Sequence, residues 1–152
     1  GYLGDREKQC VCMPGQVARY RKKLSGPILD RIDLHIEVPR LKFDKLTEEK
    51  VAAASVEWRA QIEAARAIQR QRFNGLGYTV NAEMPVQDIK KFCAVDLSTQ
   101  ELFRNAVDRL HLSARAYHRV LKLSRTIADL AAAERIEQNH VAEALNYRPK
   151  TD

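Results

Sequence analysis

From residue 47 onward, apolar side chains recur with the period of an α-helix, and capping and stop signals divide this pattern into separate helices. The longest helix is capped by Thr47 and is expected to end near Phe73, where Asn74-Gly75 is a helix-stop signal. Its inner face is predicted to hold two rows of side chains: Val51, Trp58 and Ala65 beside Ser55, Ile62 and Gln69. Helices patterned in this way bury one face against each other. The sequence therefore predicts a mainly α fold, with a bundle of four to five helices over residues 41–150.

Shorter helices follow the long one, and each begins at a local signal. These signals are Pro85, a capping box of Ser98 and Glu101, Ser113, and Asn139. The corresponding helices are predicted over residues 85–93, 99–110, 114–131 and 139–147. The helix that follows Ser113 is expected to face the core with Tyr117, Val120, Leu121, Ser124, Ile127 and Ala128.

The first 40 residues lack a sustained period and predict a mostly irregular segment. Residues 1–23 are expected to form a loop that passes into a basic stretch around Tyr20. Residues 34–38 alternate apolar and polar side chains and stop at Pro39, which indicates a short strand. One strand of this length has no partner in the rest of the sequence. It is therefore expected to belong to a sheet that other residues contribute.

The charge and cysteine content narrow the classes of function. A net charge of +6 and a pI near 9.4 fit an anionic partner such as DNA, RNA or a nucleotide phosphate, and they fit equally a basic surface that only maintains solubility. No apolar run of 18 residues is present, so no membrane span is expected. Three cysteines do not form a disulfide framework, which favours a reducing cytoplasm. A self-contained hydrolase is the least supported class, because no Ser–His–Asp or paired-carboxylate arrangement is evident.

Two arginines are candidates for a phosphate site. Arg31, between Asp30 and Asp33, could be an arginine finger that neutralises charge on a phosphoryl group held by a neighbouring subunit. The alternative is a local ion pair with one of the two aspartates. Arg115 is predicted to lie in the first turn of the helix capped by Ser113, where free N–H groups add to an anion site. Its alternative is a solvated arginine whose stem covers apolar surface.

A basic edge is predicted farther along the same helix. Arg119, Lys122 and Arg125, together with His118, could follow a nucleic-acid backbone. A charge run opposite a core face also fits a merely solvated surface. Few aromatic side chains are interleaved with these cations, so stacking on single-stranded bases is only weakly indicated.

Cys10 and Cys12 form a C-x-C pair, which supplies half of the four ligands of a structural zinc site. No other cysteine pair in the sequence completes this site, because Cys93 lies in a helical pattern and is expected in the core. The metal interpretation would strengthen only if two further cysteines preceded Gly1.

Taken together, these motifs resemble the magnesium-chelatase-like AAA+ ATPases, in the branch that includes bacterial competence proteins. The resemblance is carried by residues 1–5, 10–12, 19–34, 112–130 and 140–148. It implies that the chain is the C-terminal part of a larger ATPase. Residues 1–40 would be the trailing edge of the ATPase core, expected to be mobile in isolation, and residues 41–150 would be the helical lid.

The same resemblance assigns roles to single residues. Arg31 would be the arginine finger, acting in trans, and Arg115 the sensor-2 arginine that contacts the ATP phosphates. ATP and Mg²⁺ would be held by motifs N-terminal to Gly1, where a Cys-Pro-Cys turn would face Cys10 and Cys12 at a possible zinc site. The intact protein would be a homo-oligomeric ring that works on DNA in recombination and natural transformation. The alternative is a non-enzymatic helical module that binds DNA through its basic face of Arg119, Lys122 and Arg125.

Overall fold

The computed structural model describes residues 1–5, 7–23, 26–38 and 55–149. These residues form helices and connecting loops without a strand, so the predicted mainly α class is confirmed for the part of the chain described. The elements are α1 (Pro14–Arg21), α2 (Gly26–Leu29), α4 (Ser55–Arg72), the 3-10 turn η1 (Asn81–Glu83), α5 (Val86–Phe92), α6 (Leu97–Leu110), α7 (Ala114–Leu130) and α8 (Gln138–Asn146).

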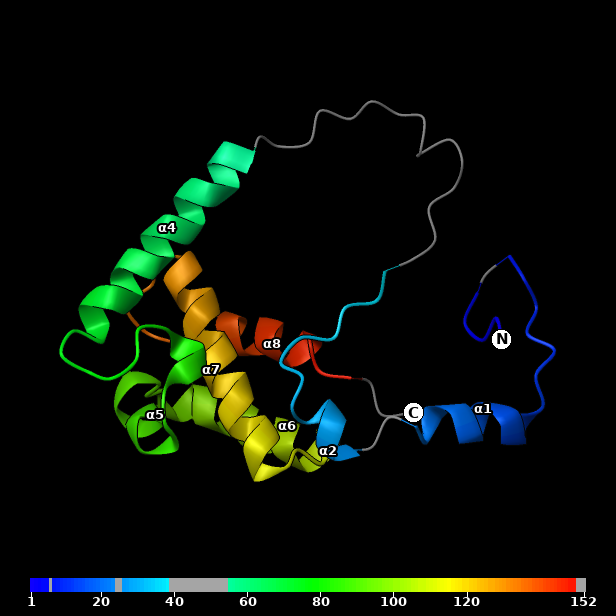
Figure 1. Cartoon of the computed structure of the whole chain (residues 1–152). Coiled ribbons are helices and arrows are strands. Elements are labelled where there is room, and N and C mark those ends of the chain that lie inside the picture. The colour runs from blue at the N-terminus through cyan, green and yellow to red at the C-terminus, as the bar shows by residue number, and fades with distance from the viewer. Residues whose placement is uncertain (6, 24–25, 39–54, 150–152) are drawn as a thin grey trace.

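Helix α7 is the centre of the bundle. It contacts α4, η1, α5 and α8, and α6 completes the bundle by packing against α8 (Figure 1). The predicted inner face of α7 is confirmed, because Val120, Leu121, Ser124, Ile127 and Ala128 are buried and Tyr117 is half-buried. The rest of the core is apolar and comes mainly from the neighbouring elements, namely Phe73, Met84, Ile89, Cys93, Phe103, Ile136, Val141 and Ala144.

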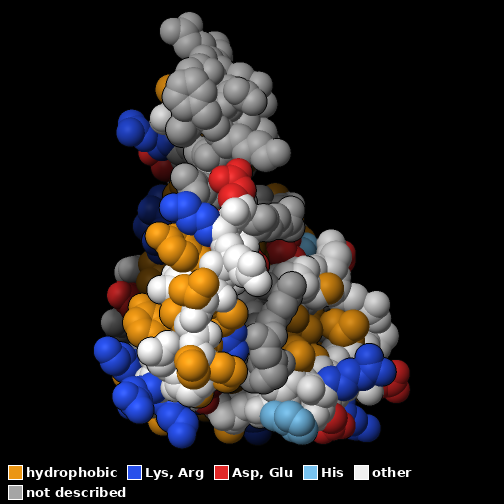
Figure 2. Space-filling model, turned by 90° about the vertical axis from the view of Figure 1, so that its right-hand side faces the viewer, with side chains coloured by type: hydrophobic (Ala, Val, Ile, Leu, Met, Phe, Trp, Pro, Cys, Tyr) orange, Lys and Arg blue, Asp and Glu red, His pale blue; other side chains and the backbone are white. Residues whose placement is uncertain are grey.

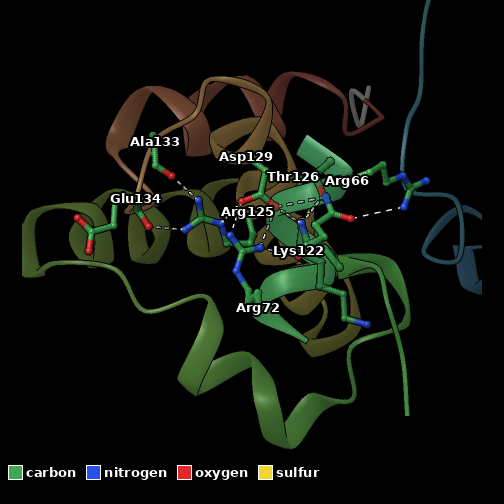
Figure 3. A network of polar contacts seen from close by, with 10 residues as sticks. Arg66, Arg72, Lys122, Arg125, Thr126, Asp129, Ala133 and Glu134 are labelled. Atoms are coloured by element: carbon green, nitrogen blue, oxygen red, sulfur yellow. Dashed lines mark hydrogen bonds and ion pairs between the residues drawn. The ribbon is translucent and has the colours of Figure 1, made fainter. Parts of the chain in front are cut away.

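A buried carboxylate ties three of these elements together. The side chain of Asp129 is fully buried in α7, and Arg72 of α4 donates to both of its oxygens, at 2.5 and 2.8 Å. Asn81 of η1 donates to it at 2.8 Å, Gln69 at 3.2 Å and Arg125 at 3.0 Å (Figure 3). Burial raises the pKa of Asp129, but hydrogen bonds from Arg72 and Asn81 and the nearby arginine charges outweigh it and hold that pKa below its usual value.

Helix α4 is only partly covered by the bundle. It ends as predicted, with Phe73 buried and Gly75 in the left-handed region at φ 81°. On the predicted inner face Ala65 and Gln69 are buried, whereas Trp58 is 58% and Ile62 52% exposed. The first half of α4 extends beyond α7 (Figure 1), which explains this difference. The expected cap at Thr47 lies outside the described residues.

Two of the predicted caps need correction. Helix α6 is capped by Asp96, whose Oδ1 accepts from the Thr99 amide at 2.7 Å, while Ser98 donates its hydroxyl to the same carboxylate. Helix α8 begins at Gln138, one residue before the expected cap at Asn139. The cap at Ser113 is confirmed, since its Oγ accepts from the Ala116 amide at 3.1 Å.

The segment before the bundle contains helices that the sequence did not reveal. Helix α1 begins at Pro14, where the missing N–H of proline leaves no helical hydrogen bond unmade, but it buries no residue and lies apart from the bundle (Figure 1). Tyr20 of α1 is 73% exposed. Figure 2 views the molecule from the right-hand side of Figure 1, and hydrophobic and basic side chains are exposed side by side on that face.

The strand predicted over residues 34–38 is wrong for this chain. These residues have no regular structure, and the amide of His35 donates to the carbonyl of Tyr147 at 2.8 Å, just after α8. Without neighbouring strands to pair with, the backbone donor of His35 is satisfied at the end of a helix.

Candidate functional site

A pocket of about 640 Å³ follows the N-terminal half of α7. Arg115, His118, Arg119 and Lys122 line it together, because a spacing of three and four residues places side chains on one face of a helix. Residues of other elements form the rest of its wall, among them Asp33, Leu34, Ala82 and Val86. The sequence-predicted Arg115, Arg119 and Lys122 are thus brought to one surface.

Arg115 is the cation of this pocket that the described contacts leave without an acceptor. It is exposed in the first turn of α7, a turn that holds no acidic side chain. The N-terminus of a helix carries a partial positive charge and free N–H groups, so a cation placed there adds to an anion-favouring field. This arrangement is suited to a phosphate or another oxyanion.

The two cations behind Arg115 already have partners. Arg119 forms an ion pair with Asp33, and Lys122 donates to the carbonyl of Ala82 at 3.0 Å. Burial at the pocket wall and the charge of Arg119 lower the pKa of Lys122, although Asp33 opposes this shift. An anion that enters the pocket would therefore compete with Asp33 for Arg119.

Arg125 does not belong to the basic edge that the sequence predicted. It is 3% exposed and donates to Asp129 and to the carbonyls of Glu134 at 2.9 Å and Ala133 at 2.7 Å (Figure 3). The reason is its position four residues after Leu121, which puts it on the core side of α7. Asp129 lies a further four residues on, and this spacing of an arginine and an aspartate was the signal in the sequence for an ion pair.

Arg31 is exposed after α2, and its Nη1 donates to the carbonyl of Pro27 at 3.2 Å. The local ion pair considered from the sequence is not among the described contacts. Asp30 is bound instead by Arg148, and Asp33 by Arg119. Within the described residues, the charge of Arg31 is therefore not neutralised by either neighbouring aspartate.

Cys10 and Cys12 are half-buried and face the start of the chain. A Cβ placed on Gly1 would lie 3.2 Å from the Sγ of Cys12 and 3.8 Å from that of Cys10. Hydrogen bonds from the backbone of Cys12 and Tyr2 lower the pKa of Cys10, which favours the thiolate that metals bind. Among the residues described, no group of three or more metal-ligating side chains occurs. Two thiolates fit zinc chemically, but they are half of a site.

Arg148 and Ser113 are residues of this region to which the sequence assigned no such contacts. Both donate to the carboxylate of Asp30, Arg148 at 3.2 Å and Ser113 at 2.7 Å. These pairs join positions 83 and 118 residues apart, so neither helical period nor local spacing could reveal them. The contacts fasten the segment around Asp30 to the bundle.

None of the helices in the described residues combines the length and apolar character needed to cross a membrane.

Two family models match successive parts of the sequence. Residues 52–148 match "Magnesium chelatase, subunit ChlI C-terminal", and residues 1–46 match "Magnesium chelatase, subunit ChlI". The chain therefore belongs to the magnesium chelatase ChlI family, and the helices from α4 to α8 lie in the part that matches the C-terminal region of that family.

Among curated proteins, the competence protein ComM of Haemophilus influenzae is 42% identical over 137 residues, which is 89% of this chain and 26% of that protein. The YifB protein of Escherichia coli K12 is 36% identical over 148 residues, 97% of this chain and 28% of that protein. The YifB protein of Salmonella typhimurium is 34% identical over 150 residues, with 97% and 28% covered. The chain spans about a quarter of the length of these relatives, and the resemblance to the competence-protein branch is confirmed.

Proposed function

We propose that this chain is the C-terminal lid part of a ring-forming AAA+ ATPase. Residues 41–150 would be the helical lid and residues 1–40 the trailing edge of the ATPase core. The two family matches support a division of this kind, because one ends at residue 46 and the other begins at residue 52, a few residues after the proposed boundary. In the intact protein the lid would cover ATP and Mg²⁺ held by the core.

The observation that carries the proposal is the position of Arg115. An exposed guanidinium without an acceptor among the described residues lies at the positive end of α7 and lines a pocket with three further basic side chains. This is the position from which a sensor-2 arginine would contact the ATP phosphates. Arg119 and Lys122 would add positive potential behind it.

Arg31 would act as the arginine finger of the neighbouring subunit. This role is supported because the aspartates on either side of Arg31 are bound by other cations, so the charge of Arg31 is available for a phosphoryl group. A finger that serves a neighbour requires an oligomer, so a homo-oligomeric ring is part of the proposal.

The work done by the ring would be on DNA. The name of the ComM relative supports a role in competence, and recombination during natural transformation is the process that we propose. A stand-alone DNA-binding module receives less support, because Arg125 is buried and both Arg119 and Lys122 are already bound within the chain. A zinc site at Cys10 and Cys12 would exist only if the intact protein supplied two more ligands.

A mixing experiment tests the two arginine roles in the intact ring. Arg31→Ala should leave ATP binding nearly intact and reduce hydrolysis on the order of a thousandfold. Arg115→Ala should weaken both ATP affinity and turnover, because its side chain would contact phosphate before and during the reaction. Arg135→Ala, which changes an exposed arginine before α8, is the matched control.

Mixed rings of Arg31→Ala subunits and subunits without a working phosphate loop should regain activity. Each Arg31→Ala subunit keeps an intact ATP pocket, and a neighbour of the other type can supply Arg31 to it. If such mixed rings form and remain as inactive as either parent, Arg31 does not act in trans.

A further inference from the structure

We propose that Arg148 is a positioning residue, which acts through Asp30 to hold Arg31 at a fixed place on the lid. The proposal rests on the function proposed above for Arg31 and Arg115, and it adds the connection between them. Three residues, Asp30, Ser113 and Arg148, form this connection, which we call the latch.

The latch joins the segment that carries Arg31 to the start of α7 and to the residues just after α8. Asp30 accepts from Arg148 with Oδ1 at 3.2 Å and from the hydroxyl of Ser113 with Oδ2 at 2.7 Å. Arg148 also donates to the carbonyl of Ile32 at 3.1 Å. Its guanidinium therefore binds the residue before Arg31 and the residue after it.

Of the two ion pairs that hold this segment, Asp30–Arg148 is the one whose disruption should cost more, because it is the more buried. The side chain of Arg148 is 5% exposed and that of Asp30 34%, whereas Arg119 and Asp33 are 28% and 49% exposed. A nearly buried guanidinium loses its hydration and depends on its protein partners, while an exposed pair is screened and contributes little. Loss of the Asp33–Arg119 pair would accordingly leave the segment in place.

Ser113 connects the latch to the candidate phosphate site. Its hydroxyl donates to Asp30 and accepts from the amide of Ala116, so one oxygen both caps α7 and holds the segment of Arg31. Arg115 lies two residues after this cap. Through this one oxygen, the start of α7 and the segment of Arg31 are held in a fixed relation to each other.

The first test uses the 152-residue chain without nucleotide. The amide of His35 donates to Tyr147 and lies beyond the latch, so its hydrogen-exchange rate reports whether the segment stays bound. Arg148→Gln and Asp30→Asn should each accelerate this exchange by about tenfold or more. Amides in the middle of α7, such as that of Val120, should remain protected, and Arg135→Gln should change neither. Unchanged protection of His35 in Asp30→Asn, a variant that leaves the bundle core intact, would overturn the latch whatever the role of Arg31.

The second test uses the intact ATPase. Arg148→Gln should lower kcat more than it raises KM for ATP, because the latch holds the segment of the finger directly and reaches the pocket of its own subunit only through Ser113 and the wall residues Asp33 and Leu34. The double variant Arg31→Ala/Arg148→Gln should be no slower than Arg31→Ala alone, since Arg148 acts through Arg31. Additive losses would show that Arg148 has a separate role and would contradict the proposal. If Arg31→Ala itself has full activity, the proposed finger is wrong, while the exchange of His35 still decides whether the latch exists.

Discussion

Asp129 shows how a single buried charge can organise a small bundle. Its carboxylate accepts hydrogen bonds from α4, η1 and its own helix, and two of the donors, Arg72 and Arg125, are cations. Removing one member of a buried ion pair leaves the other charge without compensation, which costs more than the pair contributes when intact. Loss of this side chain is therefore expected to destabilise the packing of α4, η1 and α7 together.

We expect Asp129→Asn to destabilise the chain by about 3–5 kcal/mol, the range for breaking a buried ion pair. Urea unfolding followed by circular dichroism measures the change. Asp108→Asn, an exposed aspartate on α6, is the matched control and should have little effect. Equal losses in the two variants would contradict the importance of the Asp129 network.

The pH dependence follows from the same side chain. Because the pKa of Asp129 is held below its usual value in the fold, the stabilisation that it provides is present above the ordinary carboxyl range near pH 4 and is lost as pH falls through the folded-state pKa. The difference in stability between the wild type and Asp129→Asn should therefore be constant from pH 7 to about pH 5 and shrink only in stronger acid.

The thiols of Cys10 and Cys93 should differ in reactivity. Burial raises the pKa of Cys93 to about 11, whereas the pKa of Cys10 is lowered by backbone hydrogen bonds. Since the thiolate is the reactive form, a disulfide reagent at pH 8 should modify Cys10 rapidly and leave Cys93 unmodified until the chain unfolds. Mass spectrometry of the labelled peptides identifies the sites. Fast labelling of Cys93 in the folded chain would contradict its burial.

At the scale of whole elements, helix caps decide where α6 begins. The carboxylate of Asp96 accepts from the amide of Thr99, and hydrogen bonds from Thr99 and Ser98 lower its pKa. Asp96→Ala should therefore lower the urea midpoint more than Ser98→Ala, which removes only a donor to the cap. A larger effect of Ser98→Ala would instead favour the capping box predicted from the sequence.

Local patterns predicted the elements that depend on neighbouring residues. The spans of α5 and α7 and the inner face of α7 followed from periodicity and from the caps at Pro85 and Ser113. Helix α1 was missed because it has no buried face to create a period. The Asp129 network and the latch were missed because their partners are far apart in the sequence. The helical spacing correctly placed Arg115 in the first turn of α7. It wrongly assigned Arg125 to an exposed face, because spacing shows which residues share a face and only packing shows which face is covered.

At the scale of the molecule, the proposed phosphate site would be only partly supplied by this chain. We expect the purified 152-residue chain to release no phosphate from ATP above background. Phosphoryl transfer needs a phosphate cradle and a metal held by acidic side chains, and the sequence has no phosphate loop while its described residues form no metal-ligating group. A colorimetric phosphate assay measures this. Turnover that persists through repeated purification and falls with Arg115→Ala would contradict the proposed division of labour.

The exposed half of α4 gives the molecule an optical signal of its own. Trp58 is the one tryptophan of the sequence, and its side chain is 58% exposed on the part of α4 that extends past α7 (Figure 1). Its indole is therefore a solvated fluorophore, with red-shifted emission that iodide should quench. Since the candidate phosphate pocket is lined by other elements, anions bound there should leave this emission unchanged. A blue shift would instead report that another surface has covered the helix, so the native chain can report contact at this end of α4 without any attached label and without interference from anions in the pocket.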